Sequence, residues 1–120
     1  MSCHILGFPR IGHQRELKFA QESFWKGKIG VEELQKVGAE LRLRHWNVQK
    51  KAGLSTVATG DFSMYDKMLD TCLMLGAIPS RFAGEPVEAL ETYFHLARGD
   101  KEKNIPAMEM TKWFNTNYHY

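Results

Sequence analysis

Apolar residues recur at helical intervals most clearly between residues 31 and 53. The acids Glu32 and Glu33 come first, which suits the amino end of a helix, and Gly53 suits its end. Between them runs an apolar stripe with the period of an α-helix, formed by Leu34, Val37, Leu41, Val48 and Ala52. The spacing predicts a long helix of about 20 residues with this stripe facing a core.

Two shorter helices are predicted by the same period. One covers residues 14–26 and ends near Gly27. Its core-facing residues are Leu17, Ala20, Phe24 and Trp25. The other starts with Pro86 in its first turn and ends at Gly99. Its core-facing residues are Val87, Leu90, Phe94 and Ala97. After Gly99, the charged residues 100–104 are expected to form a solvated loop.

A fourth helix is predicted from a capping pattern. Ser63 and Asp66 fit the S-x-x-D signature of a helix start, and Gly76 with Pro79 suits its end. Its predicted buried stripe consists of Met64, Met68, Leu69, Cys72 and Leu75. The methionines are interpreted as flexible core residues rather than as ligands.

Short apolar segments predict the strands. Residues 3–8 lead into a turn rich in glycine and proline, and residues 54–58 are closed by Gly60 and Asp61. In the aromatic tail, residues 107–120, we expect a short helix or turn that leads into a third strand. The order strand, helices, strand, helices, strand suggests βα units, so we predict an α/β fold with a parallel sheet.

Composition places the chain among ordinary globular proteins. It has 120 residues, of which 43% are hydrophobic and 25% charged, and a net charge of +2. Residues 1–53 hold ten Lys and Arg against five Asp and Glu, whereas the remainder holds six against nine. Basic character therefore lies in the first half, but the total is too small to favour a nucleic-acid binder or an anionic membrane.

Cysteine and histidine spacing indicates no local metal site. Cys3 and Cys72 lie far apart, and the histidines form no HxxxH or HExxH pattern. Free thiols suit a reducing compartment. We find no run of about 18 apolar residues and no charged leader before an apolar core. We therefore expect a cytoplasmic protein with no metal ligands of its own and no membrane partner.

The first candidate site is the motif GFPRIG at residues 7–12 with the RELK sequence that follows it. Arg15 and Lys18 are three residues apart, so they share one face near a helix amino end. Cations are unfavourable there unless an anion binds; with Arg10 and unpaired backbone N–H groups they would hold a phosphate or carboxylate. The alternative is a solvated basic face on which Lys18 pairs with Glu22. The turn is neither a Walker loop nor GxGxxG.

The second candidate site lies in the aromatic tail. Its polar members, which could orient a polar planar ligand, are Lys112, Asn115, Asn117 and Tyr118. The alternative is that Trp113 and Phe114 belong to the core and that the polar residues only end a strand. Asp61 is a further candidate, because ligand sites of α/β folds gather at the carboxyl ends of strands.

Three motifs carry a family resemblance across residues 3–120. GFPRIG with RELK, GDFSMYD and the closing EMTKWFNTNYHY resemble the amino-terminal segment of cobalamin-independent methionine synthase, the 5-methyltetrahydropteroyltriglutamate:homocysteine methyltransferase. The departures fall around residues 81–88 and 100–104. The resemblance implies two (β/α)8 barrels with the folate between them. It also assigns the folate's polyglutamate tail to Arg15, Glu16, Leu17, Lys18, Lys112 and Asn117.

The resemblance further implies what the chain lacks. The family transfers a methyl group from the folate to homocysteine with the help of zinc and without cobalamin, and its zinc and homocysteine sites belong to the carboxyl-terminal barrel. Residues 1–120 would then be the amino-terminal part of the tail-binding barrel, about three strands of a (β/α)8 barrel that takes about 250 residues. We expect no catalytic residue in this chain and no turnover by it alone.

Another class of function stays open at this point. The chain could instead be a stand-alone, non-enzymatic module that binds folate or another polyanion. In either case an incomplete barrel should expose sheet edges and part of an apolar helix face, through which the chain could associate with itself.

Overall fold

The computed structural model describes residues 2–86 and 89–119 and divides the chain into two compact units, one ending at Met64 and the other starting at Tyr65. The first unit holds helices α1 (Glu16–Trp25) and α2 (Val31–Lys51). The second holds α3 (Lys67–Leu75), the short 3-10 helix η1 (Ser80–Phe82), α4 (Leu90–Arg98), and strands β1 (Met110–Trp113) and β2 (Thr116–His119). None of the described helices is long and apolar enough to cross a membrane.

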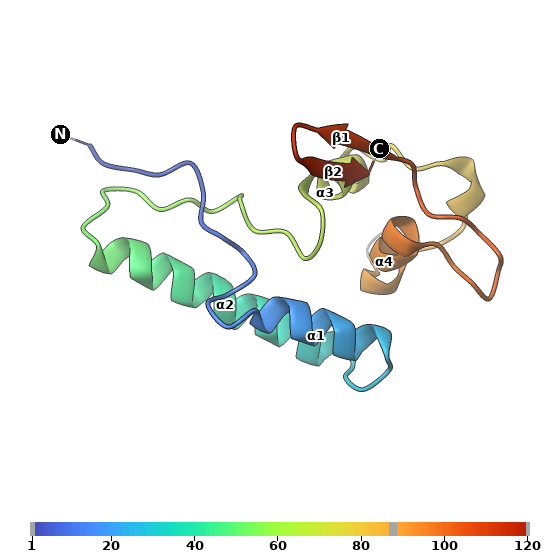
Figure 1. The fold of residues 1–120 in the computed structure, drawn as a ribbon, viewed down its shortest axis with the longest axis horizontal. Helices are drawn as coiled ribbons and strands as arrows, with labels where there is room; N and C mark the ends of the chain where they lie inside the picture. The colour runs from blue at the N-terminus through green and yellow to red at the C-terminus, as the bar shows by residue number, and fades with distance from the viewer. Residues whose placement is uncertain (1, 87–88, 120) are drawn as a thin grey trace. The chain divides into compact units, whose positions relative to one another are not determined.

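The first unit is a helical hairpin in which α1 lies along α2 (Figure 1). The fully or nearly fully buried side chains of Leu17, Leu34 and Leu41 form its core, as the apolar stripes predicted. Gly38 of α2 is closely packed, because a Cβ there would lie 2.6 Å from Met64 Cε, and the Met64 side chain would have to shift to admit it. At the end of α2 the prediction fails, since Val48 and Ala52 are exposed.

The predicted strands at residues 3–8 and 54–58 are not strands in the structure. The two segments nevertheless run alongside each other in the same direction. Ser55 N donates to Cys3 O at 2.9 Å, and Phe8 N donates to the Asp61 carboxylate at 2.6 Å. Parallel strands form where both faces are covered, whereas Leu6 is almost completely exposed. The two segments are therefore aligned, but they do not form the hydrogen-bond ladder of a parallel sheet.

The second unit packs α3 against both α4 and β2. Its core combines Leu69 from α3, Phe82 from η1, and a group from α4 and the segment before β1: Tyr93, Phe94, Leu96, Ala97 and Met108. After α4 the chain passes Gly99 with φ of +78°, where a Cβ would lie 2.7 Å from Ile105 O, so only glycine fits this turn.

Helix boundaries in the second unit correct three predictions. The N-cap of α3 is Asp66 and not Ser63, and Leu69 alone of the predicted stripe is buried, since Met68 and Leu75 are exposed. Helix α4 begins at Leu90, so Pro86 lies before it; Val87 is outside the described residues.

The aromatic tail is an antiparallel hairpin rather than a helix or turn leading into a parallel strand. Strand β1 pairs with β2 across the two-residue turn of Phe114 and Asn115. Trp113 and Phe114 are 66% and 86% exposed, so they are not core residues of this unit. The described residues thus form an α/β fold of four α-helices and one two-stranded antiparallel sheet, while the partial (β/α)8 barrel stays a prediction.

Candidate functional site

The amino end of α1 is a tight turn with unusual backbone geometry. Arg15 is the N-cap and has a left-handed conformation, with φ of +60°. Arg15 N donates to Gly12 O at 3.1 Å, and Leu17 N donates to Ile11 O at 3.0 Å. Two amides expected to be available to an anion are therefore used within the chain, and strain of this kind at a non-glycine residue often marks a functional position.

Of the four residues of RELK, Leu17 is buried, Glu16 is partly exposed, and Arg15 and Lys18 are exposed. Leu17 is fully buried, so it could offer a ligand only its backbone. The Glu16 carboxylate accepts from Gln14 N at 3.0 Å and pairs with Arg44 at 2.5 Å. A hydrogen bond from its own backbone amide, followed by the bond from Arg44, lowers the pKa of Glu16. The exposed cations that remain are Arg15 and Lys18.

Lys18 is held only loosely by its helix neighbour. Its ammonium lies 3.8 Å from the Glu22 carboxylate, and its side chain is 50% exposed. Exposed pairs of this type contribute about 0–1 kcal/mol, so a ligand carboxylate could replace Glu22 at little cost. The pairing foreseen by the solvated-face interpretation is thus present, and it is compatible with anion binding.

Two other candidates in the first unit have structural roles. The Arg10 guanidinium donates to Ser63 O at 3.4 Å and to Met64 O at 3.1 Å, so it joins the turn at residues 7–12 to residues 63–64. The Asp61 carboxylate accepts from Phe8 N at 2.6 Å and so ties residues 3–8 to the segment before Asp61.

The hairpin brings Lys112 and Asn117 together. They are directly opposite each other in the register of β1 and β2, and both are exposed. Opposed residues of an antiparallel pair have Cβ atoms roughly 4.5–5.5 Å apart, so one ligand group can reach both side chains. Of the other residues in this predicted cluster, Asn115 lies in the turn and Tyr118 pairs with Thr111, which places it on the other face.

A buried polar cluster in the second unit was not foreseen from sequence. Asp66 and His119 have side chains that are only 5% and 3% exposed, and they form an ion pair at 2.8 Å. The Tyr93 hydroxyl accepts from Tyr65 N and Asp66 N at 3.0 and 2.9 Å. Asp66 was recognised as part of a capping signal, but nothing in the sequence links it to a histidine 53 residues away.

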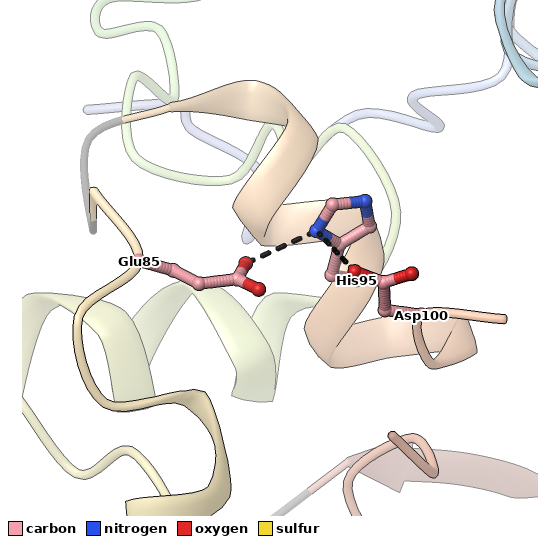
Figure 2. A group of neighbouring side chains, drawn as sticks. All are labelled: Glu85, His95 and Asp100. Carbon is pink, nitrogen blue, oxygen red and sulfur yellow. Dashed lines mark hydrogen bonds and ion pairs between the residues drawn. The ribbon is translucent and has the colours of Figure 1, made fainter. Parts of the chain in front are cut away.

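A second charged cluster consists of Glu85, His95, Asp100 and Lys103. Figure 2 shows His95 Nδ1 between the two carboxylates, 3.0 Å from Glu85 and 4.0 Å from Asp100. The Lys103 ammonium lies 2.7 Å from Glu85 and 3.5 Å from Asp100. Its hydrogen bond, followed by that of His95, lowers the pKa of Glu85, and the reciprocal bond from Glu85 raises the pKa of Lys103.

This cluster is the described group whose atoms come closest to a metal-ligand set. The Lys103 ammonium pairs with both carboxylates and offsets one of their two negative charges, and Asp100 also accepts from the backbone amides of Glu102 and Lys103. We therefore interpret the cluster as an internal ion-pair network that stabilises the turn after α4. The resemblance assigns the family's zinc to the carboxyl-terminal barrel, so this cluster is not the site expected for it.

Comparison with known proteins identifies the family to which this chain belongs. The family model described as cobalamin-independent synthase, N-terminal domain, matches residues 2–120. The chain belongs to this family.

Named relatives agree over the whole chain. The chain is 58% identical over 123 residues to the 5-methyltetrahydropteroyltriglutamate–homocysteine methyltransferase of Syntrophotalea carbinolica, and the match covers 100% of this chain and 16% of the relative. Identity to that of Paraburkholderia xenovorans is 59% over 118 residues, covering 98% and 15%. Methyltransferase 2 of Arabidopsis thaliana is 53% identical over 121 residues, covering 100% and 16%. The chain thus spans about a sixth of these relatives' length.

Proposed function

We propose that this chain is the folate-tail-binding part of a methyltransferase that moves a methyl group from 5-methyltetrahydropteroyltri-L-glutamate to L-homocysteine, forming L-methionine. Membership of the cobalamin-independent synthase family and the names of the relatives support the proposal. The structural observation that carries it is the exposed pair Arg15 and Lys18, three residues apart at the start of α1, with buried Leu17 and the Arg44-paired Glu16 between them.

A polyglutamate tail presents the carboxylates that the cations Arg15 and Lys18 can bind. Each γ-linked glutamate adds a carboxylate, so the tail is a flexible polyanion. Arg15 offers a planar fork of donors and Lys18 a mobile ammonium, and both lie at the positive end of the α1 dipole. Because Glu16 is tied to Arg44, its charge is partly compensated close to the proposed ligand position.

The hairpin pair offers a second set of contacts. We propose that the Lys112 ammonium binds a tail carboxylate, while the Asn117 amide can donate to a carboxylate and accept from a peptide N–H. Their direct opposition across β1 and β2 supports this role. Remote tail contacts of this kind help to position the reacting methyl group.

The chemical step needs groups outside this chain. Zinc would supply Lewis acidity that favours the homocysteine thiolate, and we propose that its ligands lie in the part of the relatives that this chain does not cover. For the location we propose the cytoplasm, because Cys3 and Cys72 are both free thiols.

Titration calorimetry with mono- and triglutamyl methylfolate tests tail binding. We expect the chain to prefer the triglutamate, and Lys18→Gln and Lys112→Gln each to lower triglutamate affinity about tenfold, as loss of one charged hydrogen bond predicts. Lys36→Gln is the matched control, since Lys36 also pairs with a glutamate four residues on and is 75% exposed. Equal affinity for both ligands, or equal losses with Lys36→Gln, would contradict the proposal.

A turnover assay tests the missing chemistry. The chain incubated with methylfolate triglutamate, homocysteine and zinc should form no methionine. A full-length relative, such as the Syntrophotalea carbinolica enzyme, serves as the positive control. Methionine formed by the chain alone would show that the reacting groups lie within residues 1–120.

A further inference from the structure

The Asp66 carboxylate joins the hairpin to α3. Its Oδ1 atom caps the helix by accepting from Met68 N at 2.8 Å and Leu69 N at 3.1 Å. Its Oδ2 atom accepts from both His119 N and His119 Nδ1 at 2.8 Å. One buried carboxylate thus fixes the start of a helix with one oxygen and the end of β2 with the other.

The His119 ring reaches a third element. Its Nε2 atom lies 2.9 Å from Ala97 O in α4. The Asp66 carboxylate and the Ala97 carbonyl oxygen are both acceptors, so each ring nitrogen of His119 lies within hydrogen-bonding distance of an acceptor on a different element. Through these three hydrogen bonds, His119 joins the hairpin to the N-cap residue of α3 and to α4.

The hairpin's two faces have different surroundings. Thr111 and Tyr118 line a cavity of about 430 Å³ together with α3, whereas Lys112 and Asn117 alternate with them and are exposed. Rotation of the hairpin about its axis would therefore move the Lys112 and Asn117 side chains. His119, two residues after Asn117 on the same strand, opposes that rotation.

We propose that Asp66 and His119 are positioning residues for binding the polyglutamate tail, acting through Lys112 and Asn117. The proposal rests on the tail-binding function proposed above. The ion pair holds β2 at one orientation, so that the ammonium of Lys112 and the amide of Asn117 are presented together. When the pair is broken, the hairpin keeps its own ladder but loses its fixed orientation, and the advantage of the triglutamate over the monoglutamate declines.

Two variants separate the ion pair from the helix cap. Asp66→Asn keeps an oxygen that can cap α3, because asparagine is a good N-cap residue, but it removes the negative charge beside His119. His119→Gln leaves Asp66 intact and removes the imidazole ring that contacts Asp66 and Ala97. Tyr118→Phe, one residue away on β2, is the control. If His119→Gln does not fold, Asp66→Asn carries the test.

Hydrogen exchange of the chain and folate titrations give the readouts. We expect both variants to speed exchange of the hairpin amides while the α3 amides stay protected, and to lower triglutamate affinity about tenfold with little change for the monoglutamate. Lys112→Gln should add no further loss in the His119→Gln background, because both changes act on the same contact. Additive losses, or unchanged hairpin exchange, would overturn the proposal.

The two proposals fail in different ways. If the unmodified chain does not prefer the triglutamate, tail binding fails and the positioning role with it, whereas hairpin exchange still shows whether His119 anchors β2. If Lys112→Gln weakens tail binding but His119→Gln and Asp66→Asn do not, the tail-binding function stands and the positioning role is wrong.

Discussion

The apolar core of the first unit comes from two helices that are neighbours in sequence, whereas the second unit combines a larger apolar core with a buried polar cluster around Asp66. Leu17, Leu34 and Leu41 need only helical periodicity to meet in the first unit. In the second, Asp66, Tyr93 and His119 come from three separate elements and satisfy one another's hydrogen bonds. The exposed pair Arg15 and Lys18 therefore follows from local helix structure, while the orientation that we propose for Lys112 and Asn117 needs contacts distant in sequence.

Leu17→Ala should produce the largest effect and tests the apolar side of the comparison. Leu17 is fully buried, so truncation leaves a cavity and should lower the free energy of unfolding by about 2–5 kcal/mol. Urea denaturation monitored at the α1 and α2 amides measures the loss. Leu43→Ala, at a position 59% exposed on α2, should cost far less; equal losses would mean that Leu17 is not a core residue.

Tyr93→Phe tests the polar side. The change removes the hydroxyl that accepts from Tyr65 N and Asp66 N, so two buried amides lose their partner and unfolding should become easier by about 1–3 kcal/mol. The Tyr118 hydroxyl forms no hydrogen bond with the described residues, which makes Tyr118→Phe a matched control. A loss no greater than that of the control would show that apolar packing dominates this unit as well.

Phe114→Gly should have a smaller effect, of opposite sign. Phe114 has φ of +54° in the hairpin turn, a conformation that favours glycine. Relief of this strain should stabilise the hairpin by up to about 1 kcal/mol, measured by hydrogen exchange of the β1 and β2 amides. Phe114→Ala keeps the strain while removing the ring. If the alanine variant is equally stabilised, the exposed ring and not the backbone is the cause.

Lys103→Gln should cause the smallest change in stability but a clear change in titration. The pKa of Glu85, lowered first by Lys103 and then by His95, should rise toward its ordinary value of 4.5. A carboxylate whose pKa is lowered in the folded state stabilises the fold at pH values above its ordinary pKa. This contribution is lost as the pH falls through the folded-state pKa. The variant should therefore show a weaker loss of stability on acidification. NMR titration measures the pKa of Glu85, with Lys101→Gln as the control.

The helices could be predicted from sequence, but the pairing of segments could not. The period of α2 and the burial of Leu17 follow from local spacing alone. Residues 3–8 have the composition of a strand, yet a strand needs a paired and covered neighbour, and the structure supplies only the alignment. The antiparallel hairpin was missed because its two-residue turn has Phe114, not glycine, at a positive φ.

The site shows the same division. The exposure of Arg15 and Lys18 near one helix end follows from helix geometry. The pairing of Glu16, in contrast, depends on Arg44, 28 residues further along the chain. Likewise, Arg10 is a cation in the right segment, but its guanidinium donates to Ser63 O and Met64 O. A charge visible in sequence identifies a candidate ligand residue, and its distant partners decide whether it is available.

The long separation of the closing contacts has a kinetic consequence. Asp66 and His119 are 53 residues apart, and Phe8 and Asp61 close a loop of the same size in the first unit. Helices form within about a microsecond, whereas such loops pay their closure entropy before any contact compensates for it. We therefore expect each of these contacts to form late in the folding of its unit. Weakening such a contact should speed unfolding more than it slows folding, so loss of the Asp66–His119 contact should shorten the time for which the hairpin stays packed against α3.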